Sequence, residues 1–371
     1  MWALTRCCII TILLVYSQIH NSNATTGDDQ FIVAGYLPDY RSYMNINATS
    51  LHLTDVMLFS LTPEAVLHYS ESSSAGCCLS EEHFTLLRKA RSHKHLEQTK
   101  SRLRLLITIG GGGRSDGFGN IVTGSSSTKH QFLQGLIKIC KENDFDGIDL
   151  DFENIQTLGE WKAYLQFLVQ ASTFLHKHNL LATVALHPGQ FLPEHVCQSL
   201  DRVHVMAYDM IATQSYNSPT KHHASFQSMQ NAMSSFTSNG CPSSKLIMGV
   251  PAYARHESNP GLVKTYEEVI SEFISEQEGT VEQIDVSSIN ELNFWKGYWF
   301  DSASDVKEKC EYAKRKKYGG VLLWEIGQDK QISGLADGAF LSSLPLKLLI
   351  PYPAILLRMK EMTPSKKNCK R

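Results

Sequence analysis

The chain has 371 residues, of which 42% are hydrophobic and 19% are charged. This composition is that of a globular protein with ample material for a core, and the length suits one large α/β barrel or two ordinary domains. The formal net charge of −2 provides no basic surface for nucleic acid, so we expect no nucleic-acid partner.

The N-terminal segment resembles a secretory signal peptide. Arg6 is followed by a short apolar run and then by polar residues, and the run is too short to span a bilayer comfortably. We therefore expect residues 1–24 to be removed and the mature protein to be secreted or lysosomal, with no membrane association. Sequons at Asn23 and Asn47 agree with this route. A buried N-terminal helix is the alternative.

Short apolar runs then alternate with helical patterns along most of the chain. Helices with one apolar face are expected at Lys129–Asn143, Glu160–His176, Phe226–Ser238 and Asp305–Lys316. Strands are expected at Phe31–Gly35, Asp55–Leu61, Arg104–Ile109, Gly147–Phe152, Leu181–Leu186, Val203–Tyr208, Leu246–Val250 and Gly320–Trp324. Eight nearly apolar strands, mostly followed by helices, predict an α/β fold, a single (β/α)8 TIM barrel. A doubly wound sheet shows the same alternation, and the number of strands separates the two.

The barrel is expected to occupy residues 28–343. Residues 255–318, before the last strand, exceed what one helix needs, so we expect a modest insertion at the C-terminal face of the barrel. The apolar segment 344–357 is interrupted by Pro345, Pro351 and Pro353 and is too short for a transmembrane helix. Residues 344–371 are expected to form a disordered tail, for which no function is evident.

Three carboxylates alternate with apolar residues in the fourth expected strand. Asp149, Asp151 and Glu153 are separated by Leu150 and Phe152, so a strand would place the three acids on one side. Such closely packed anions repel one another, and at least one should hold its proton near neutral pH. A protonated acid beside ionised neighbours is what cleavage of a glycosidic bond requires.

Two other interpretations of the alternating acids are weaker. A solvent-facing strand would explain them, but both faces of a strand in a parallel barrel are covered. A cation site would also explain them, but the segment lacks the loop glycine and the spacing of an EF-hand. We therefore expect catalysis and no metal. Because Glu153 should stand at the mouth of the barrel, it is the natural general acid, with Asp151 and Asp149 progressively deeper.

The segment Asp146–Glu153 resembles the DxxDxDxE signature of family 18 glycoside hydrolases, the chitinases and their relatives. Five further segments resemble strands of that family in the same order, namely Phe31–Tyr36, Thr108–Gly111 (with Thr where the family has Ser), Met206–Asp209, Gly249–Arg255 and Gly319–Glu325. The resemblance extends over most of the mature chain. It implies a retaining, substrate-assisted hydrolase of β-1,4-linked N-acetylglucosamine chains, such as chitin, that needs no cofactor.

The resemblance implies a role for each catalytic residue. Glu153 would protonate the leaving oxygen, and the substrate's own 2-acetamido oxygen would act as the nucleophile. Asp151 would orient the acetamido N–H with Asp149 behind it, and Tyr208 would hydrogen-bond the acetamido carbonyl.

Substrate-binding residues are implied in the same way. Asp209 would contact the sugar, and Trp324 would form the floor of the subsite that holds the distorted sugar, because an indole suits the apolar face of a pyranose. Tyr36 would line that subsite, and Tyr253 and Arg255 are further candidates. Family members with a deep cleft carry a full α+β insertion, for which residues 255–318 are too few. This favours soluble oligosaccharides or shallow endo-type cleavage.

Several other glycine, cysteine and histidine residues could suggest a binding or catalytic role, but structural or surface roles are expected for most of them. Gly110–Gly113 lacks the Lys-Ser/Thr of a phosphate-binding loop, so it is expected to allow a tight turn after the third strand. Cys140 is expected to be a small buried hydrophobe. Seven cysteines follow the expected signal peptide, so disulfides are possible but one thiol must remain unpaired. Solvated surface positions are expected for the histidine pairs His93/His95, His176/His178 and His222/His223, whereas His187, just past the fifth strand, is a weaker candidate for the site.

Two alternatives to a chitin hydrolase remain open at this stage. A carbohydrate-binding lectin on the same barrel would have no catalysis, and such relatives typically lose the acid at the position of Glu153, which this chain keeps. An enzyme acting on the chitobiose core of N-glycans would use the same machinery. Glu153, Asp151 and Tyr208 favour activity without choosing between chitin and glycan.

Overall fold

The computed structural model describes residues 30–41, 53–71, 81–96, 102–213, 221–277 and 286–329. All of them belong to one compact unit, Thr5–Gln331. The expected signal peptide, both sequons and the expected C-terminal tail lie outside the described residues. None of the helices in the described part of the chain is long and apolar enough to cross a membrane.

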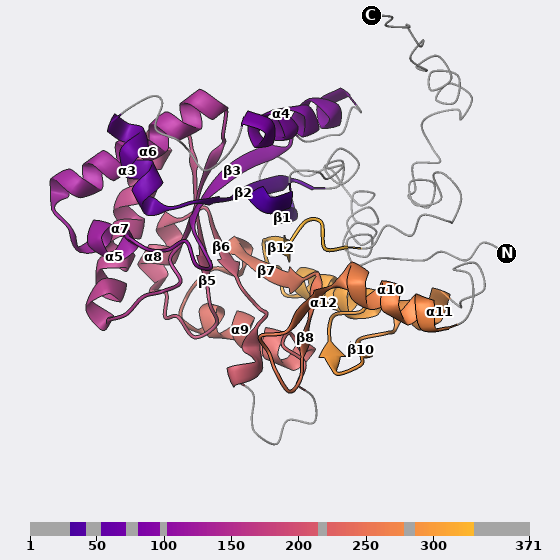
Figure 1. The fold of residues 1–371 in the computed structure, drawn as a ribbon. Helices are drawn as coiled ribbons and strands as arrows, with labels where there is room; N and C mark the ends of the chain where they lie inside the picture. Colours follow the sequence, from indigo (N-terminus) through magenta and orange to yellow (C-terminus); the bar gives the residue numbers. More distant parts are fainter. Residues whose placement is uncertain are drawn as a thin grey trace, which may run out of the picture. The chain divides into compact units, whose positions relative to one another are not determined.

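Eight parallel strands close into a barrel in the order β1-β12-β7-β6-β5-β4-β3-β2 (Figure 1). The closed ring confirms the TIM barrel and excludes the doubly wound sheet. The strands are almost entirely buried because the barrel interior and the surrounding helices cover both of their faces. Their bounds are β1 Ile32–Pro38, β2 Asp55–Leu61, β3 Arg104–Gly110, β4 Gly147–Asp151, β5 Leu181–Leu186, β6 Arg202–Val205, β7 Leu246–Pro251 and β12 Gly320–Trp324.

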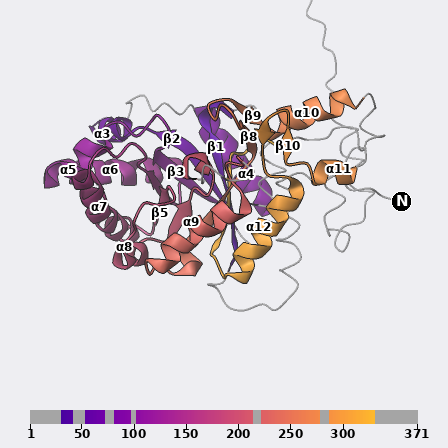
Figure 2. The ribbon, with the colours of Figure 1, turned by 90° about the horizontal axis from the view of Figure 1, so that it is seen from below.

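Helices pack around this barrel, as Figure 2 shows from below. In chain order they are α3 Pro63–Glu71, α4 Glu81–Leu96, α5 Phe118–Thr123, α6 Ser126–Asn143, α7 Leu158–His176, α8 Glu194–Ser199, α9 Phe226–Ser238 and α12 Ala303–Arg315, with short 3-10 turns at Asp39–Arg41, Met210–Thr213 and Ser243–Lys245. Local sequence fixes several starts. The side chain of Thr157 caps α7, and Glu160 bonds back to the Thr157 backbone, which satisfies two otherwise orphaned N–H groups.

The insertion before the last strand is a small α+β unit. It contains β8 Tyr253–His256, β9 Val263–Thr265, α10 Tyr266–Glu276, α11 Val286–Asn290, β10 Phe294–Trp295 and β11 Tyr298–Trp299. The four strands form an antiparallel sheet in the order β10-β11-β8-β9. Because β8 begins two residues after β7 ends, the sheet continues directly from the C-terminal end of a barrel strand.

Most cysteines of the described residues have simple structural roles. Cys197 of α8 and Cys241, which follows α9, form a disulfide across a sequence separation of 44. Cys140 and Cys310 are buried free thiols. Burial raises the pKa of Cys310 to about 12, so it stays neutral, and Cys140 is 1% exposed, as expected for a small hydrophobe.

An ion-pair layer lies among the first residues of the barrel strands. Asp55 is 0% exposed. It accepts two hydrogen bonds from Arg104, at 2.8 and 2.9 Å, and a third from Arg202 at 2.6 Å. Burial alone would raise the pKa of Asp55, but the guanidinium of Arg202 and the bonds from Arg104 outweigh it and lower that pKa from 3.8 to about 2. The pair is therefore ionised at all ordinary pH values.

We expect Asp55→Asn to destabilise the fold by about 3 kcal/mol at neutral pH, because it leaves a largely buried guanidinium without its counter-ion. Above pH 3.8 the lowered pKa of Asp55 stabilises the wild-type fold, and this contribution, roughly 2 kcal/mol, should be lost as the pH falls through 2. Urea unfolding between pH 2 and 7 measures both effects. A variant as stable as wild type at pH 7 would contradict the expectation, and Asp116→Asn, at an exposed loop aspartate, serves as the control.

Candidate active site

The three acids lie where the alternation predicts, at the C-terminal end of β4. Asp149 and Asp151 are 0% and 2% exposed, whereas the side chain of Glu153 is 26% exposed. The strand ends at Asp151, so Glu153 lies two residues beyond it rather than in its last position. The depth order is therefore as expected, and Glu153 is the acid that solvent can reach.

Asp149 is held as an anion by four neighbouring side chains. Tyr36 and Thr183 donate to its oxygens at 2.7 and 2.6 Å, Thr108 donates at 3.3 Å, and Nδ1 of His204 lies 3.0 Å from Oδ1. Burial alone would raise the pKa of Asp149. The His204 ring and the hydrogen bonds outweigh that effect and lower the pKa below its ordinary value.

The surroundings of Asp151 shift its pKa in the opposite direction. Burial raises its pKa well above 3.8, and the carboxyl groups of Glu153 and Asp149 raise it further. Its Oδ1 atom is buried without a hydrogen-bond partner among the described residues. The proton that the crowded acids must retain is therefore on Asp151, which can donate it in a new direction once a partner enters the site.

Glycines at the end of β3 allow this close packing. Gly110 has φ +94°, and a Cβ there would lie 2.2 Å from the carbonyl oxygen of Asp151. Gly111 donates its N–H to that oxygen at 2.7 Å. Ser115 donates to the same oxygen at 3.0 Å and accepts the N–H of Glu153 at 3.2 Å. The tight turn expected from the glycines is confirmed, and it fixes the backbone that carries the two upper acids.

Glu153 has one side-chain partner that the sequence only weakly indicated. Nε2 of His187 lies 3.3 Å from its Oε2 atom. A turn presents His187, because its N–H donates to the side chain of Gln190 at 2.6 Å and its carbonyl accepts the N–H of Gln190 at 3.2 Å. His187 therefore belongs to the site.

Tyr208 and Asp209 follow β6 and lie beside the acids. Tyr208 is 6% exposed; burial raises the pKa of its phenol well above 10.0 and the carboxyl of Asp151 raises it further, so the hydroxyl remains a donor. Asp209 accepts from Tyr253 at 2.6 Å, and Arg255 binds both of its oxygens. Burial alone would raise the pKa of Asp209, but bonds from His223 and Arg255 lower it.

Aromatic rings gather at the ends of β1, β2 and β12. Trp324 is partly buried, and its ring centroid lies 5.3 Å from that of Tyr36 and 4.8 Å from that of Phe59. The Trp324–Glu325 peptide bond is cis. Tyr36 is 2% exposed and directs its hydroxyl to Asp149, so in this structure it supports the acid from below. Phe59 carried no signal in the sequence beyond strand hydrophobicity.

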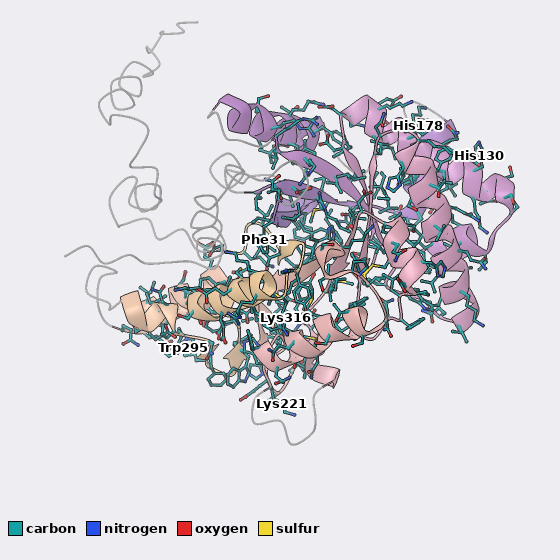
Figure 3. The ribbon with its side chains drawn as sticks, turned by 180° about the vertical axis from the view of Figure 1, so that it is seen from behind. Phe31, His130, His178, Lys221, Trp295 and Lys316 are labelled. Atoms are coloured by element: carbon teal, nitrogen blue, oxygen red, sulfur yellow. A yellow bond between two sulfur atoms is a disulfide. The ribbon has the colours of Figure 1, made fainter. Side chains whose placement is uncertain are left out.

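The expected surface positions of His222 and His223 are wrong. They are 6% and 0% exposed, whereas His176 and His178 are exposed as expected. Figure 3 labels His178. His223 Nδ1 lies 3.2 Å from Asp209, so it is part of the site's support. Nε2 of His222 lies 2.9 Å from the carbonyl of Phe300 and Nε2 of His223 lies 3.2 Å from that of Tyr253, contacts with the insertion that a pattern of helices and strands does not reveal. The side chains of His93 and His95 lie outside the described residues.

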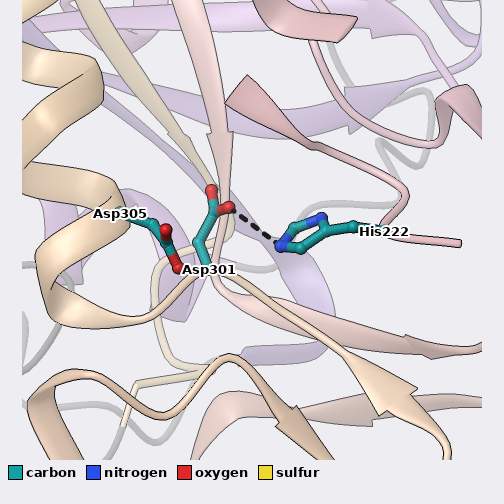
Figure 4. Close-up of side chains that lie close together, drawn as sticks. All are labelled: His222, Asp301 and Asp305. Atoms are coloured by element: carbon teal, nitrogen blue, oxygen red, sulfur yellow. Dashed lines mark ion pairs between the residues drawn. The ribbon is translucent and has the colours of Figure 1, made fainter. Parts of the chain in front are cut away.

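His222 lies near Asp301 and Asp305 in a group that could suggest a metal site (Figure 4). Its Nδ1 accepts the N–H of Ala224 at 3.0 Å, and its Nε2 lies 2.9 Å from the carbonyl of Phe300 and therefore donates. Burial lowers the pKa of His222 well below 6.5, so the ring is neutral.

The carboxylate of Asp301 already has a cation. Lys309, 1% exposed, contacts its two oxygens at 2.6 and 2.5 Å. Asp305 accepts from the N–H and hydroxyl of Ser302, the N-cap residue of α12, and so closes the capping box of that helix. The group is therefore a structural ion pair beside a helix start.

Together, these observations define the class of protein: a (β/α)8 barrel with a protonated carboxyl between two others, at the end of a barrel strand where such folds carry their active sites. The sequence profile of the glycosyl hydrolases family 18 matches residues 32–329. The chain belongs to this family.

Individual relatives agree with this assignment. An endochitinase of Manduca sexta is 23% identical over 295 residues, which cover 64% of this chain and 53% of that protein. The chain thus spans about half the length of that relative. A class V chitinase mutant from Cycas revoluta, solved in complex with (GlcNAc)3, has a TM-score of 0.62 and 21% identity, covering 80% of this chain and 95% of that one. A chitinase-like agglutinin from Robinia pseudoacacia has a TM-score of 0.60 and 18% identity, covering 83% and 98%.

Proposed function

We propose that the protein is a retaining glycoside hydrolase that cleaves β-1,4-linked N-acetylglucosamine chains by substrate assistance. The observation that carries this proposal is the position of the shared proton. Asp151 is neutral between the ionised Asp149 and the solvent-accessible Glu153. A buried, protonated carboxyl is a poor nucleophile but a good hydrogen-bond partner for an acetamido group.

In the first step the proton that Asp151 shares with Glu153 passes through Glu153 to the glycosidic oxygen, which leaves Asp151 as a carboxylate. The bond from the anomeric carbon to that oxygen breaks while the acetamido oxygen bonds to the same carbon, which forms an oxazolinium ion. The Asp151 carboxylate formed in this way accepts the acetamido N–H and compensates the positive charge that grows on the oxazolinium ring. Tyr208, whose phenol remains protonated, donates to the acetamido oxygen and holds it in line for attack.

In the second step water replaces the acetamido oxygen. Glu153, now a carboxylate, takes one proton from the attacking water, and the configuration at the anomeric carbon is retained. His187, whose Nε2 lies 3.3 Å from Oε2 of Glu153, holds this carboxyl in position. Trp324 supports the distorted sugar, and Asp209, with Arg255 and Tyr253, binds its polar edge.

A lectin without catalysis is the second candidate, and the similarity in fold to an agglutinin is the observation that favours it. Fold likeness at this identity says nothing about catalysis. Glu153, together with its two neighbouring acids, favours hydrolysis over binding alone. The chitobiose core of N-glycans is an alternative substrate for the same machinery.

Secretion is part of the proposal. The Cys197–Cys241 disulfide suits an oxidising compartment, and the N-terminal sequence fits a signal peptide. We propose an extracellular or lysosomal location for the mature chain.

The experiment that tests the function compares chitotetraose, polymeric chitin and a high-mannose glycopeptide as substrates and records the product lengths. We expect chitotetraose to be cleaved, with the β-anomer as the initial product because the mechanism retains configuration. Cleavage of the glycopeptide alone would establish the N-glycan alternative. Inactivity on all three, with retained binding of chitotetraose, would establish the lectin.

A further inference from the structure

The strand beside the three acids gives each of them a different neighbour. β5 runs parallel to β4 with its residues in a fixed register. Side chains two residues apart along a strand project to the same face, so one face of β5 meets the face of β4 that carries the acids. Continued in steps of two past the last paired residues, the register gives three neighbouring pairs: Thr183 with Asp149, Ala185 with Asp151 and His187 with Glu153.

The first two neighbours differ in whether they can donate a hydrogen bond. Thr183 donates its hydroxyl to Asp149 at 2.6 Å. Ala185 is buried and has no polar side chain to offer. Oδ1 of Asp151 is correspondingly buried without a hydrogen-bond partner among the described residues. β5 therefore anchors the deepest acid and leaves the middle one able to take a new partner.

The third neighbour, His187, contacts one oxygen of the outermost acid. Its Nε2 atom lies 3.3 Å from Oε2 of Glu153. Hydrogen bonds between catalytic groups are often this long before the substrate binds and tighten afterwards. Within the described part of the chain the ring makes no other side-chain hydrogen bond, so we assign its N–H to Nε2, which donates to the carboxyl oxygen.

The turn after β5 holds this ring in place. Gln190 closes the turn twice, because its side chain accepts the N–H of His187 at 2.6 Å and its own N–H donates to the His187 carbonyl at 3.2 Å. Pro188 and Gly189 form the turn, and Gly189 has φ +91°, a conformation that favours glycine. Only backbone atoms of His187 take part in this closure, so its ring remains available to the acid.

The other oxygen of Glu153 faces open space. A Cβ at Gly112 would lie 3.9 Å from Oε1 of Glu153 and, apart from its chain neighbours, would meet nothing else within 4 Å in the described part of the chain. The glycine loop therefore leaves room beside Oε1, whereas the His187 ring occupies the side of Oε2. The two oxygens of one carboxyl group thus have different surroundings.

We propose that His187 is a positioning residue that decides which oxygen of Glu153 delivers the proton. Nε2–H binds Oε2 and keeps its own proton throughout, so Oε1 carries the proton that Glu153 shares with Asp151. Oε1 passes this proton to the glycosidic oxygen as the bond from that oxygen to the anomeric carbon breaks. The inference rests on the proposed function and deepens it, because His187 then matters only where the leaving group needs a proton.

The test compares two substrates that differ in their leaving group. Chitotetraose must release a sugar hydroxyl and needs a proton, whereas the 2,4-dinitrophenyl glycoside of chitobiose releases a phenolate that departs without one. His187→Ala should lower kcat/KM for chitotetraose roughly thirtyfold with KM within about twofold, and change kcat/KM for the dinitrophenyl glycoside less than about threefold. His187→Gln keeps an N–H donor at a similar reach and should recover most of the rate on chitotetraose.

His178→Ala is the matched control, since it removes an exposed imidazole from the turn after α7, and it should change neither rate. Three results would overturn the proposal: equal slowing of both substrates by His187→Ala, which would indicate damage to the whole site; an unchanged rate on chitotetraose; or a His187→Gln variant as slow as His187→Ala. The two proposals fail in different ways. A wild-type protein that cleaved neither substrate would refute the enzyme and this inference with it, whereas an active wild type with an unaffected His187→Ala variant would refute the inference alone.

Discussion

Replacement of Glu153 by glutamine is expected to reduce kcat on chitotetraose by at least about a thousandfold, because the amide has no proton to give to the leaving oxygen. The side chain has nearly the same size and is 26% exposed, so folding should be preserved. Affinity for the oligosaccharide should remain within a few-fold of wild type, since binding uses Asp209 and Trp324. Single-turnover kinetics and calorimetry with the same ligand separate the two effects.

Glu160→Gln provides the control for this variant. It removes the same charge from a neighbouring segment, and a glutamine can still close the capping box at the start of α7. Its kcat should equal that of wild type. If Glu153→Gln kept more than about a tenth of the activity, another group would have to protonate the leaving oxygen, and the proposed mechanism would be wrong.

The sequence predicted the position of these acids because they interrupt an apolar strand at a regular spacing of two residues. A buried strand in a parallel barrel must be apolar on both faces, so Asp149 and Asp151 stand out at spacing two and must share one side. Six of the eight expected strands differ from the observed ones by one residue at most at each end, whereas the first ends three residues later than expected and the sixth three residues earlier. The position of the site could therefore be predicted from the local spacing of acids and glycines, without knowledge of tertiary contacts.

The supporting residues could not be predicted in the same way. His204 reaches Asp149 from β6, 55 positions later in the chain, and its distance of 3.0 Å depends on how the ring of strands closes. The alternation of Arg202, His204 and Met206 shows at most that these side chains share a face. His223 is buried because the insertion covers it, and this is a tertiary contact rather than a pattern.

Replacement of Asp151 by asparagine is expected to remove several powers of ten from kcat while making the fold more stable at neutral pH. Activity falls because the amide cannot exchange a proton or compensate the charge of the oxazolinium ion. Stability rises because the raised pKa of Asp151 means that ionising this carboxyl is less favourable in the folded state than in the unfolded chain. At neutral pH the wild-type fold bears this cost, and the neutral amide of asparagine avoids it. The stabilising contribution of the bound proton is full below the unfolded pKa of about 4 and is lost as the pH rises through the folded pKa.

Asp149→Asn should do the opposite to stability, although it makes the same chemical change two residues away. Its pKa is lowered in the fold, so the carboxylate contributes stability above the unfolded pKa that falling pH removes, and the amide forfeits it at pH 7. Thermal unfolding of both variants at pH 4 and pH 7 measures the difference. At pH 7 we expect a higher Tm for Asp151→Asn and a lower Tm for Asp149→Asn, with the Asp151→Asn gain shrinking at pH 4. If both variants shifted Tm by the same amount in the same direction, the protonation states of Asp149 and Asp151 would not differ as described. The assignment of the neutral carboxyl to Asp151 would then be wrong.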